Sequence, residues 1–414
     1  MNDIINLVIK KPLFFLFCLF IPFDNTPLQN FGGIMTASPS SLILVPGFLV
    51  LLLERKSIKF HSKFLFFYLI TLVVSFVYYF YWSFHLYKLD SFFIFDRGFR
   101  YFLLYAFYFM SFFYCFGQSY KVIVAGAKLI VLIVFISIIV NYVAPNFINN
   151  PSIIQANVFT SSDRLRGFSL EASLFGFQLV CSALMLGILL RLRLLFVISY
   201  TVALAILTTS KGSALSFLIC ICIFFAVNGG ALFRVLLSLI MISLSYYIFK
   251  YYFFEALSSD IDSYTSVATR STMFLTGLKV FMYNPLGVGY FGYIPSIYDY
   301  APELITYMKG LFPILNFSEV SSYTLFGQYK AIGTKSMFID CLMIFGVFFL
   351  VPFFYYSKKI LNSFILNKDG LSFSLLLFVI LSNIFFISHV GSYVTTFVVA
   401  FLVMRYKRYE GKLV

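Results

Sequence analysis

The sequence predicts an all-α integral membrane protein, and three features of its composition carry that prediction. Hydrophobic residues make up 61% of the 414 residues, and phenylalanine alone occurs 57 times. A soluble domain cannot bury that much apolar surface. Charged residues make up only 11%, and they punctuate the apolar runs, which is typical of a protein with many membrane-spanning helices.

Apolar runs of sufficient length predict about twelve transmembrane helices. The first run follows Lys10 and Lys11 and has the outline of a signal peptide. It lacks a small-x-small cleavage site, so we expect it to remain as the first span. Pro46 interrupts the second run. The predicted spans are residues 12–23, 40–53, 64–82, 98–117, 122–143, 169–190, 194–209, 213–228, 235–254, 336–356, 371–388 and 392–404.

The basic residues set the expected orientation of these spans. With the N-terminus inside, the cytosolic segments carry the whole net charge of +14, and the outer segments balance to zero. This asymmetry follows the positive-inside tendency, and it predicts that both termini lie in the cytosol. The basic residues do not form a patch, so no nucleic-acid partner is expected.

No metal or cofactor is expected from the sequence. The six cysteines lie in apolar runs, and no histidine is spaced to join them, so neither disulfides nor a zinc site is predicted. Asp260 and Asp262 form an Asp-x-Asp pair of the kind that holds a divalent cation, but this is a two-residue match in a polar loop.

The spans divide the chain into three parts. Residues 1–254 hold the first nine spans, residues 255–335 form a large outer loop, and residues 336–414 hold the last three spans and a cytosolic tail. A connection as long as this loop is more often functional than idle. Within it, residues 269–283 read as an amphipathic helix along the membrane surface.

Residues 163–179, DRLRGFSLEASLFGFQL, bring ionisable groups to the start of the sixth span. If Ser169 onward is helical, Arg164, Gly167 and Glu171 share one face, with Glu171 about one turn inside the membrane. An ionisable group at membrane depth costs about 2.5–3.5 kcal/mol, so it usually faces the protein interior and acts there. The alternative is a helix-end glutamate neutralised by a neighbouring arginine.

Several cations fall on the outer side, against the insertion bias. Each one alone could be an interface anchor. Together they suit an anionic ligand, because arginine engages phosphate bidentately and lysine adds a point charge. Asp340 could pair with Lys335 across one turn, in a structural or a catalytic role. The outer cations at predicted span ends are Arg164, Arg166, Lys211, Arg270 and Lys335, with Arg97 and Arg100 as weaker members beside Asp96.

The first of these segments resembles a motif of a known family. Arg164-x-x-Gly167-x-x-x-Glu171 is similar to the Arg-x-x-Gly-x-x-x-Glu-Pro sequence at the start of a span in bacterial O-antigen polymerases of the Wzy type. Ala172 stands where the family has proline, and this departure leaves the charges intact.

Two further motifs follow in the family's order. Ser210-Lys211-Gly212 resembles the Ser-(Arg/Lys)-Gly turn of these polymerases. Arg270 and the later run NPLGVG resemble the large-loop pattern that polymerases share with O-antigen ligases. The residues of that run taken as the loop motif are Asn284, Pro285, Gly287 and Gly289.

The resemblance implies a lipid-linked glycosyltransferase of GT-C-like architecture in the bacterial inner membrane. Its donor and acceptor would be undecaprenyl-pyrophosphate-linked oligosaccharides, and a polysaccharide chain-length regulator is an expected partner beside the membrane lipids. Glu171 is the expected base, and its alternative role is a salt bridge with Arg164 or Arg270. Arg164 and Arg270 would stabilise the leaving pyrophosphate, and Arg166, Lys211 and Lys335 would bind it.

Three other functions remain open at the level of the sequence. An O-antigen ligase would carry a histidine in the large loop, and residues 255–335 contain none. A flippase for lipid-linked oligosaccharides would show two related halves and short loops, and this chain has neither. A non-catalytic membrane scaffold leaves the outer cations unexplained.

Overall fold

The computed structural model describes residues 2–54, 59–85, 89–159, 164–208, 210–228, 265–325, 333–387 and 392–411. Within these ranges the chain is helical and has no β-strand, which confirms the predicted all-α class. The helices are α1 (Asn2–Lys10), α2 (Pro12–Phe20), α3 (Gln29–Gly32), the 3₁₀ turn η1 (Gly33–Met35), α4 (Ser40–Glu54), α5 (Lys59–His85), α6 (Ser91–Phe116), α7 (Tyr120–Val143), α8 (Pro145–Asn149), α9 (Ala172–Leu190), α10 (Leu194–Leu207), α11 (Lys211–Asn228), α14 (Ser266–Tyr283), α15 (Gly289–Leu311), α16 (Ser318–Tyr323), α17 (Met337–Phe345), α18 (Val347–Leu366), α19 (Gly370–Phe385) and α20 (Tyr393–Tyr409).

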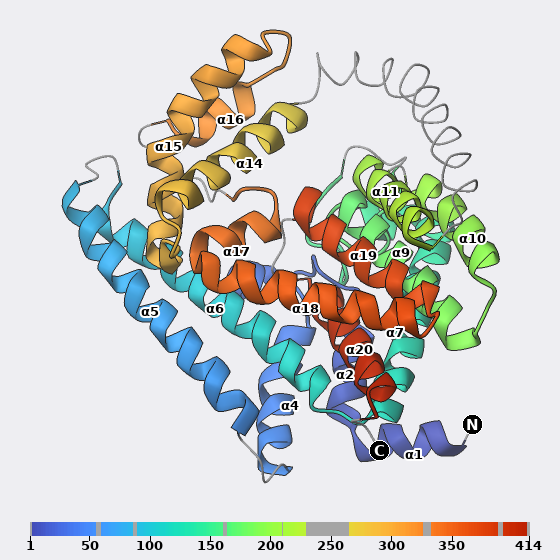
Figure 1. Cartoon of the computed structure of the whole chain (residues 1–414). Coiled ribbons are helices and arrows are strands. Elements are labelled where there is room, and N and C mark those ends of the chain that lie inside the picture. Colours follow the sequence, from blue (N-terminus) through green and yellow to red (C-terminus); the bar gives the residue numbers. More distant parts are fainter. Residues whose placement is uncertain are drawn as a thin grey trace.

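Five helices of the described chain are long and apolar enough to cross a membrane. They are α5 over Phe66–His85, α6, α7, α9 and α11, and the shorter helices α4, α10 and α19 are also apolar. On α5, Phe66, Val73 and Val77 are exposed, as side chains that face lipid would be. These helices are those of a membrane-embedded protein. Figure 1 shows both chain ends at one end of the bundle and α14, α15 and α16 at the opposite end.

Most predicted spans coincide with one helix to within a few residues, although the predicted span 235–254 lies outside the described residues. The predicted span 336–356 is wrong as a single helix. The chain breaks at Gly346 into α17 and α18, because Gly346 adopts a left-handed conformation with φ +59°. The amide of Val347 then donates to the carbonyl oxygen of Pro285 at 2.8 Å instead of continuing the helix.

The NPLGVG run packs directly against the break at Gly346. Gly287 has φ +88°, and a Cβ there would lie 2.5 Å from the carbonyl oxygen of Ile344. A Cβ on Gly346 would lie 2.3 Å from the carbonyl oxygen of Pro285. The two backbones therefore cross in direct contact, which only glycine permits. In this structure the loop motif packs against the junction between α17 and α18.

The same run also docks on α5. Gly289 has φ +66°, and a Cβ there would lie 2.4 Å from Oγ of Ser75. Oγ of Ser75 accepts a hydrogen bond from the amide of Tyr290 at 2.8 Å. The hydroxyl of Tyr78 donates to the side chain of Asn284 at 2.9 Å. Gly289 and Asn284 thus fix the position at which α15 begins.

Two apolar cores hold the bundle together. The larger core is built mainly from α2, α7, α9, α11, α19 and α20, with Phe175, Phe217 and Phe378 fully buried. The second core is built from α5, α14, α15, α17 and residues 94–108 of α6, around Tyr105 and Tyr290. The C-terminal end of α6, with Tyr114 and Cys115, belongs to the larger core, and α6 packs against α4 and α20.

Part of the segment predicted as a large outer loop is buried within the second core. Residues 289–298 of α15 are buried without exception, and α15 packs on α5, α6 and α14. The predicted helix over 269–283 is confirmed as α14, and Met273 is fully buried against the second core while Leu278 and Phe281 are half-buried. These residues therefore face protein as well as any membrane surface.

Candidate functional site at the start of helix 9

The segment that precedes α9 is a folded loop. Gly167 has φ +55°, and a Cβ there would lie 2.2 Å from the ring of Phe175. The helix begins at Ala172, with Glu171 in an extended conformation as the N-cap. The expectation that Arg164, Gly167 and Glu171 share one helix face is therefore wrong, because the left-handed turn at Gly167 ends any continuation of the helix. Glu171 lies at the helix end instead of one turn inside.

Arg164, Arg166 and Glu171 nevertheless lie close enough to act on one another. Arg164 is exposed, whereas Arg166 is 8% exposed and its guanidinium carbon lies 4.0 Å from the ring centroid of Phe159. Burial lowers the pKa of Arg166, Arg164 lowers it further, and Glu171 opposes both. Glu171 is exposed and accepts a hydrogen bond from the hydroxyl of Ser173 at 3.0 Å. The segment thus presents two guanidinium groups and one carboxylate.

Asp24 is a buried carboxyl group directly beneath this segment. It follows α2 in the sequence, is 4% exposed, and accepts a hydrogen bond from the amide of Leu170 at 2.6 Å. The side-chain amide of Gln178, from the second turn of α9, also donates to it at 3.3 Å. In addition, the ring of Phe23 stacks on that of Phe168 at 4.4 Å. Asp24 therefore ties the end of α2 to the loop that carries Arg166 and to α9.

Sequence reasoning missed Asp24, although the signal was present. The triplet Asp24-Asn25-Thr26 interrupts an apolar stretch immediately after a span, and all three residues are buried. The side-chain amide of Asn25 donates a hydrogen bond to the side-chain oxygen of Gln155, and the backbone amide of Ala156 donates to the carbonyl oxygen of Asn25 at 2.9 Å. A polar triplet that returns into the protein must be satisfied by partners from distant parts of the chain.

The stability of the folded protein is expected to depend on pH through Asp24. Burial raises the pKa of Asp24 from 3.8 to about 7, against the opposing hydrogen bond from Leu170. The native state therefore keeps a proton that the unfolded chain has lost, and stability falls as pH rises from 3.8 towards 7, by on the order of 4 kcal/mol. Melting of the purified protein between pH 5.5 and 8 checks this.

The variant Asp24→Asn should flatten that pH dependence. Asp369→Asn is the matched control, because Arg405 and other hydrogen-bond donors lower the pKa of Asp369 despite its burial, and that group stays ionised throughout the window. An unchanged slope in Asp24→Asn would contradict the assignment.

The turn that begins α11 packs against the first turns of α9. A Cβ on Gly176 would lie 2.8 Å from Cβ of Ser210, so the two segments touch. On its other side, a Cβ on Gly212 would lie 2.9 Å from the ring of Phe386 at the end of α19. Lys211 is exposed on this turn. The Ser210-Lys211-Gly212 motif thus sits between α9 and α19.

Arg270 and Lys335 lie near the end of α19, which the Lys211 turn also contacts. The guanidinium of Arg270 donates to the carbonyl oxygen of Phe386 at 3.1 Å. The ammonium of Lys335 lies 5.6 Å from the ring centroid of Tyr323. Burial and Glu319 raise the pKa of Tyr323, and Arg270 opposes them, so both cations act on the short helix α16. The structure groups these two cations around Tyr323, and the Lys211 turn links them to the Arg164 segment.

Lys335 and Asp340 form no direct ion pair with each other, although the charge of Lys335 still acts on Asp340. Lys335 has φ +61° and acts on Glu319, whose pKa falls despite burial because Thr265, Tyr323 and Lys335 stabilise its ionised form. Asp340 instead accepts hydrogen bonds from the hydroxyl of Tyr293 and from the hydroxyl of Thr334, the latter at 2.6 Å.

Among the described residues, no three histidine, cysteine or acidic side chains gather where they could hold a metal ion. The Asp260–Asp262 pair lies outside the described residues. Arg97 and Arg100 both lie near Asp96, at 3.9 Å and 3.0 Å, and are thus partly neutralised there. The described residues of the candidate site include the cations Arg164 and Arg166 and the exposed carboxylate of Glu171.

Comparisons with known proteins place the chain in a family. No model of a known protein family matches it, and no solved structure matches it either. A protein of Klebsiella pneumoniae described as "Uncharacterized 49.5 kDa protein in cps region" is 58% identical over 404 residues. The chain belongs to the same family as this protein.

The similarity to the cps-region relative extends over almost the entire molecule. It covers 98% of this chain and 94% of the relative. Because only about 2% of this chain falls outside the match, both apolar cores belong to the architecture of this family. The same holds for the elements that carry the candidate site, which are the loop before α9, the α11 turn and the 255–335 segment.

Proposed function

We propose that the chain is a polysaccharide polymerase of the bacterial inner membrane. It would transfer the growing glycan from undecaprenyl pyrophosphate to a new lipid-linked repeat unit on the outer face. The observation that carries this proposal is the cps-region relative, because cps denotes a capsular polysaccharide locus, combined with cations at the outer ends of α9, α11 and α14. The relative favours a capsular product over an O-antigen.

The proposal includes about twelve spans, a GT-C-like architecture and both termini in the cytosol. The charge pattern supports this orientation, because Arg191 lies at the opposite end of α9 from Arg164, and Arg405 lies near the C-terminal end of α20. The region 255–335 would then lie partly outside the membrane, with α14 and α16 exposed to the periplasm. A chain-length regulator would dock on that side.

The reaction requires one bond to form and one to break. A hydroxyl oxygen of the acceptor sugar attacks the anomeric carbon of the donor glycan, and the bond from that carbon to the pyrophosphate oxygen breaks. Negative charge gathers on the leaving pyrophosphate, where preorganised cations stabilise it most. Arg164 and Arg270 would supply that charge, and Arg166, Lys211 and Lys335 would hold the pyrophosphate.

The proton of the attacking hydroxyl passes to a base, and Glu171 is our choice. It is exposed at the start of α9, next to Arg164 and Arg166. Glu171→Gln is expected to reduce polymerisation by a factor on the order of 10²–10⁴. The length distribution of surface polysaccharide on gels measures it. Normal polymerisation in both Glu171→Gln and Glu171→Ala would remove Glu171 from the mechanism.

Deletion of the gene tests the proposed function as a whole. A polymerase loss leaves single repeat units on the lipid carrier or its acceptor, and no long chains. Long chains that fail to reach their final anchor would indicate a ligase. The absence of any repeat unit outside the membrane would indicate a flippase, and either outcome would overturn the polymerase proposal.

A further inference from the structure

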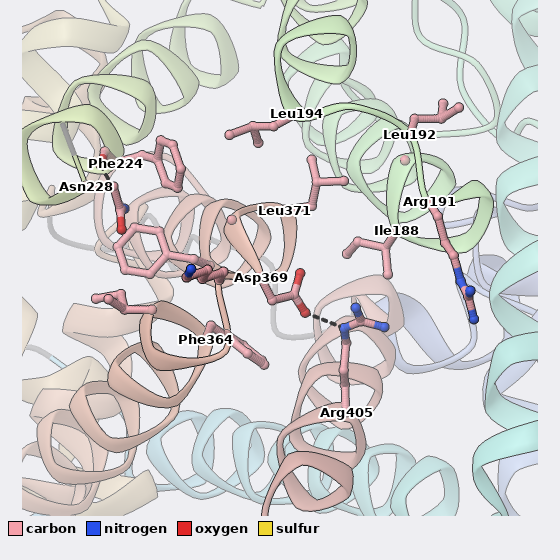
Figure 2. A pocket seen from close by; sticks show the side chains of 15 residues that line it. Ile188, Arg191, Leu192, Leu194, Phe224, Asn228, Phe364, Asp369, Leu371 and Arg405 are labelled. Carbon is pink, nitrogen blue, oxygen red and sulfur yellow. Dashed lines mark hydrogen bonds and ion pairs between the residues drawn. The ribbon is translucent and has the colours of Figure 1, made fainter. Parts of the chain in front are cut away.

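A cavity opens at the opposite end of the bundle from the candidate site. It measures about 460 Å³ and lies among the ends of α9, α11, α18 and α20 and the starts of α10 and α19. Figure 2 shows Phe224 to the left of Asp369 and Leu194 above it, whereas Arg191, Arg405 and the apolar Ile188 lie to its right. Lys368 also lines it. The charge pattern assigns this end to the cytosol.

The cavity carries a surplus of positive charge. Asp369 is its single acidic residue, and Nε of Arg405 lies 2.6 Å from that carboxylate. Asp369 also caps α19, because it accepts a hydrogen bond from the amide of Ser372 at 3.2 Å. In the part of the chain that the structure describes, neither Arg191 nor Lys368 forms an ion pair with a carboxylate. Two positive charges are thus left for a ligand.

Arg191 and Lys368 both adopt a positive φ just after the end of a helix. After α9, Arg191 has φ +54°, and the amide of Leu192 donates to the carbonyl oxygen of Gly187 at 2.9 Å. After α18, Lys368 has φ +55°, and the amide of Asp369 donates to the carbonyl oxygen of Phe364 at 2.9 Å. Each helix therefore ends in a Schellman motif with a cation where glycine is most common.

A general preference for cations at helix ends does not explain this placement. A basic residue anywhere in the last turn would stabilise the helix dipole without entering the left-handed region. Within the described residues, only three non-glycine residues adopt a positive φ, namely Arg191, Lys335 and Lys368. Two of them line one cavity. Arg191 and Lys368 adopt a positive φ at a cost in backbone conformational energy that glycine would avoid.

We infer that this cavity binds a phosphate-bearing ligand at the cytosolic edge of the bundle. Arg191 and Lys368 would grip the phosphate from opposite loops, and the apolar wall that includes Leu194, Phe224 and Leu371 would receive an attached hydrocarbon chain. A membrane phospholipid headgroup and a soluble phosphate compound share this chemistry. The site is separate from the outer cations, so it does not depend on the polymerase proposal.

Melting of the purified protein in detergent micelles tests this site. The probes are phosphatidylglycerol, phosphatidylcholine (whose headgroup has no net charge) and inorganic phosphate. A ligand that binds only the native state raises its melting temperature. We expect phosphatidylglycerol to raise it by several degrees more than phosphatidylcholine. A matching rise with inorganic phosphate alone would assign the site to a soluble phosphate compound and would still support it.

The double variant Arg191→Gly and Lys368→Gly should lose this response. Glycine suits both backbone positions, so the variant without added ligand should melt at the same temperature as the natural protein or higher. Arg193→Ala is the matched control, because Arg193 is exposed in the same turn but does not line the cavity. The inference is overturned if the response survives in the double variant, is lost equally in Arg193→Ala, or is absent from the natural protein with both anionic probes.

Discussion

Replacing Arg164 by alanine is expected to abolish long-chain polysaccharide while the protein remains in the membrane at its normal level. Arg164 is exposed, so its removal costs little packing. Under the proposed mechanism, the variant loses one preorganised charge from the leaving pyrophosphate, which typically costs about 10²–10³ in rate. Arg164→Lys should restore activity only in part, because lysine keeps the charge but not the bidentate fork. Complementation of a deletion strain, read on polysaccharide gels, measures both variants.

Arg100→Ala is the control for this prediction. Arg100 is an exposed cation near the same end of the bundle, and its guanidinium pairs with Asp96 at 3.0 Å. We expect its removal to leave chain length unchanged. Normal chains in Arg164→Ala, or an equal loss in Arg100→Ala, would show that Arg164 has no specific role in the reaction.

Gly287→Ala is expected to prevent the protein from accumulating. The added Cβ would lie 2.5 Å from the carbonyl oxygen of Ile344 and 2.8 Å from the amide nitrogen of Gly346. Both contacts are with backbone atoms that cannot rotate away, and φ +88° is itself unfavourable for alanine. We expect a loss of on the order of 3 kcal/mol or more. Protein level in membranes and the melting temperature in detergent measure the effect.

Gly310→Ala provides the comparison within the same segment. Gly310 lies in helix α15, and a Cβ built there meets nothing within 4 Å beyond its own helix backbone. Alanine should therefore stabilise that helix by roughly 0.5–1 kcal/mol. If Gly287→Ala accumulated and melted like Gly310→Ala, the crossing of the two backbones would not be essential to the fold.

Helix positions could be predicted from the sequence because apolar runs and their boundaries are local properties. The predicted span 122–143 corresponds to α7 (Tyr120–Val143), for example, because Ser119 and Pro145 flank it. The break at Gly346 could not be found in this way. It depends on a hydrogen bond from Val347 to Pro285, which is more than sixty residues away in sequence.

The candidate site could be predicted only in part. The charged residues before α9 stand out in a chain with so few charges, and the structure places Arg164, Arg166 and Glu171 together. The loop conformation at Gly167 and the partners of Asp24 could not be predicted, because both depend on contacts with other helices. The catalytic roles of these residues remain predictions.

Reconstitution tests the central claim most directly. The purified chain, placed in vesicles with undecaprenyl-pyrophosphate-linked repeat units and no other protein, should convert them into a ladder of longer lipid-linked glycans with release of undecaprenyl pyrophosphate. The Arg164→Ala protein, prepared in the same way, should not. If the natural chain leaves the repeat units unjoined, or only moves them between the two leaflets, the polymerase account is contradicted.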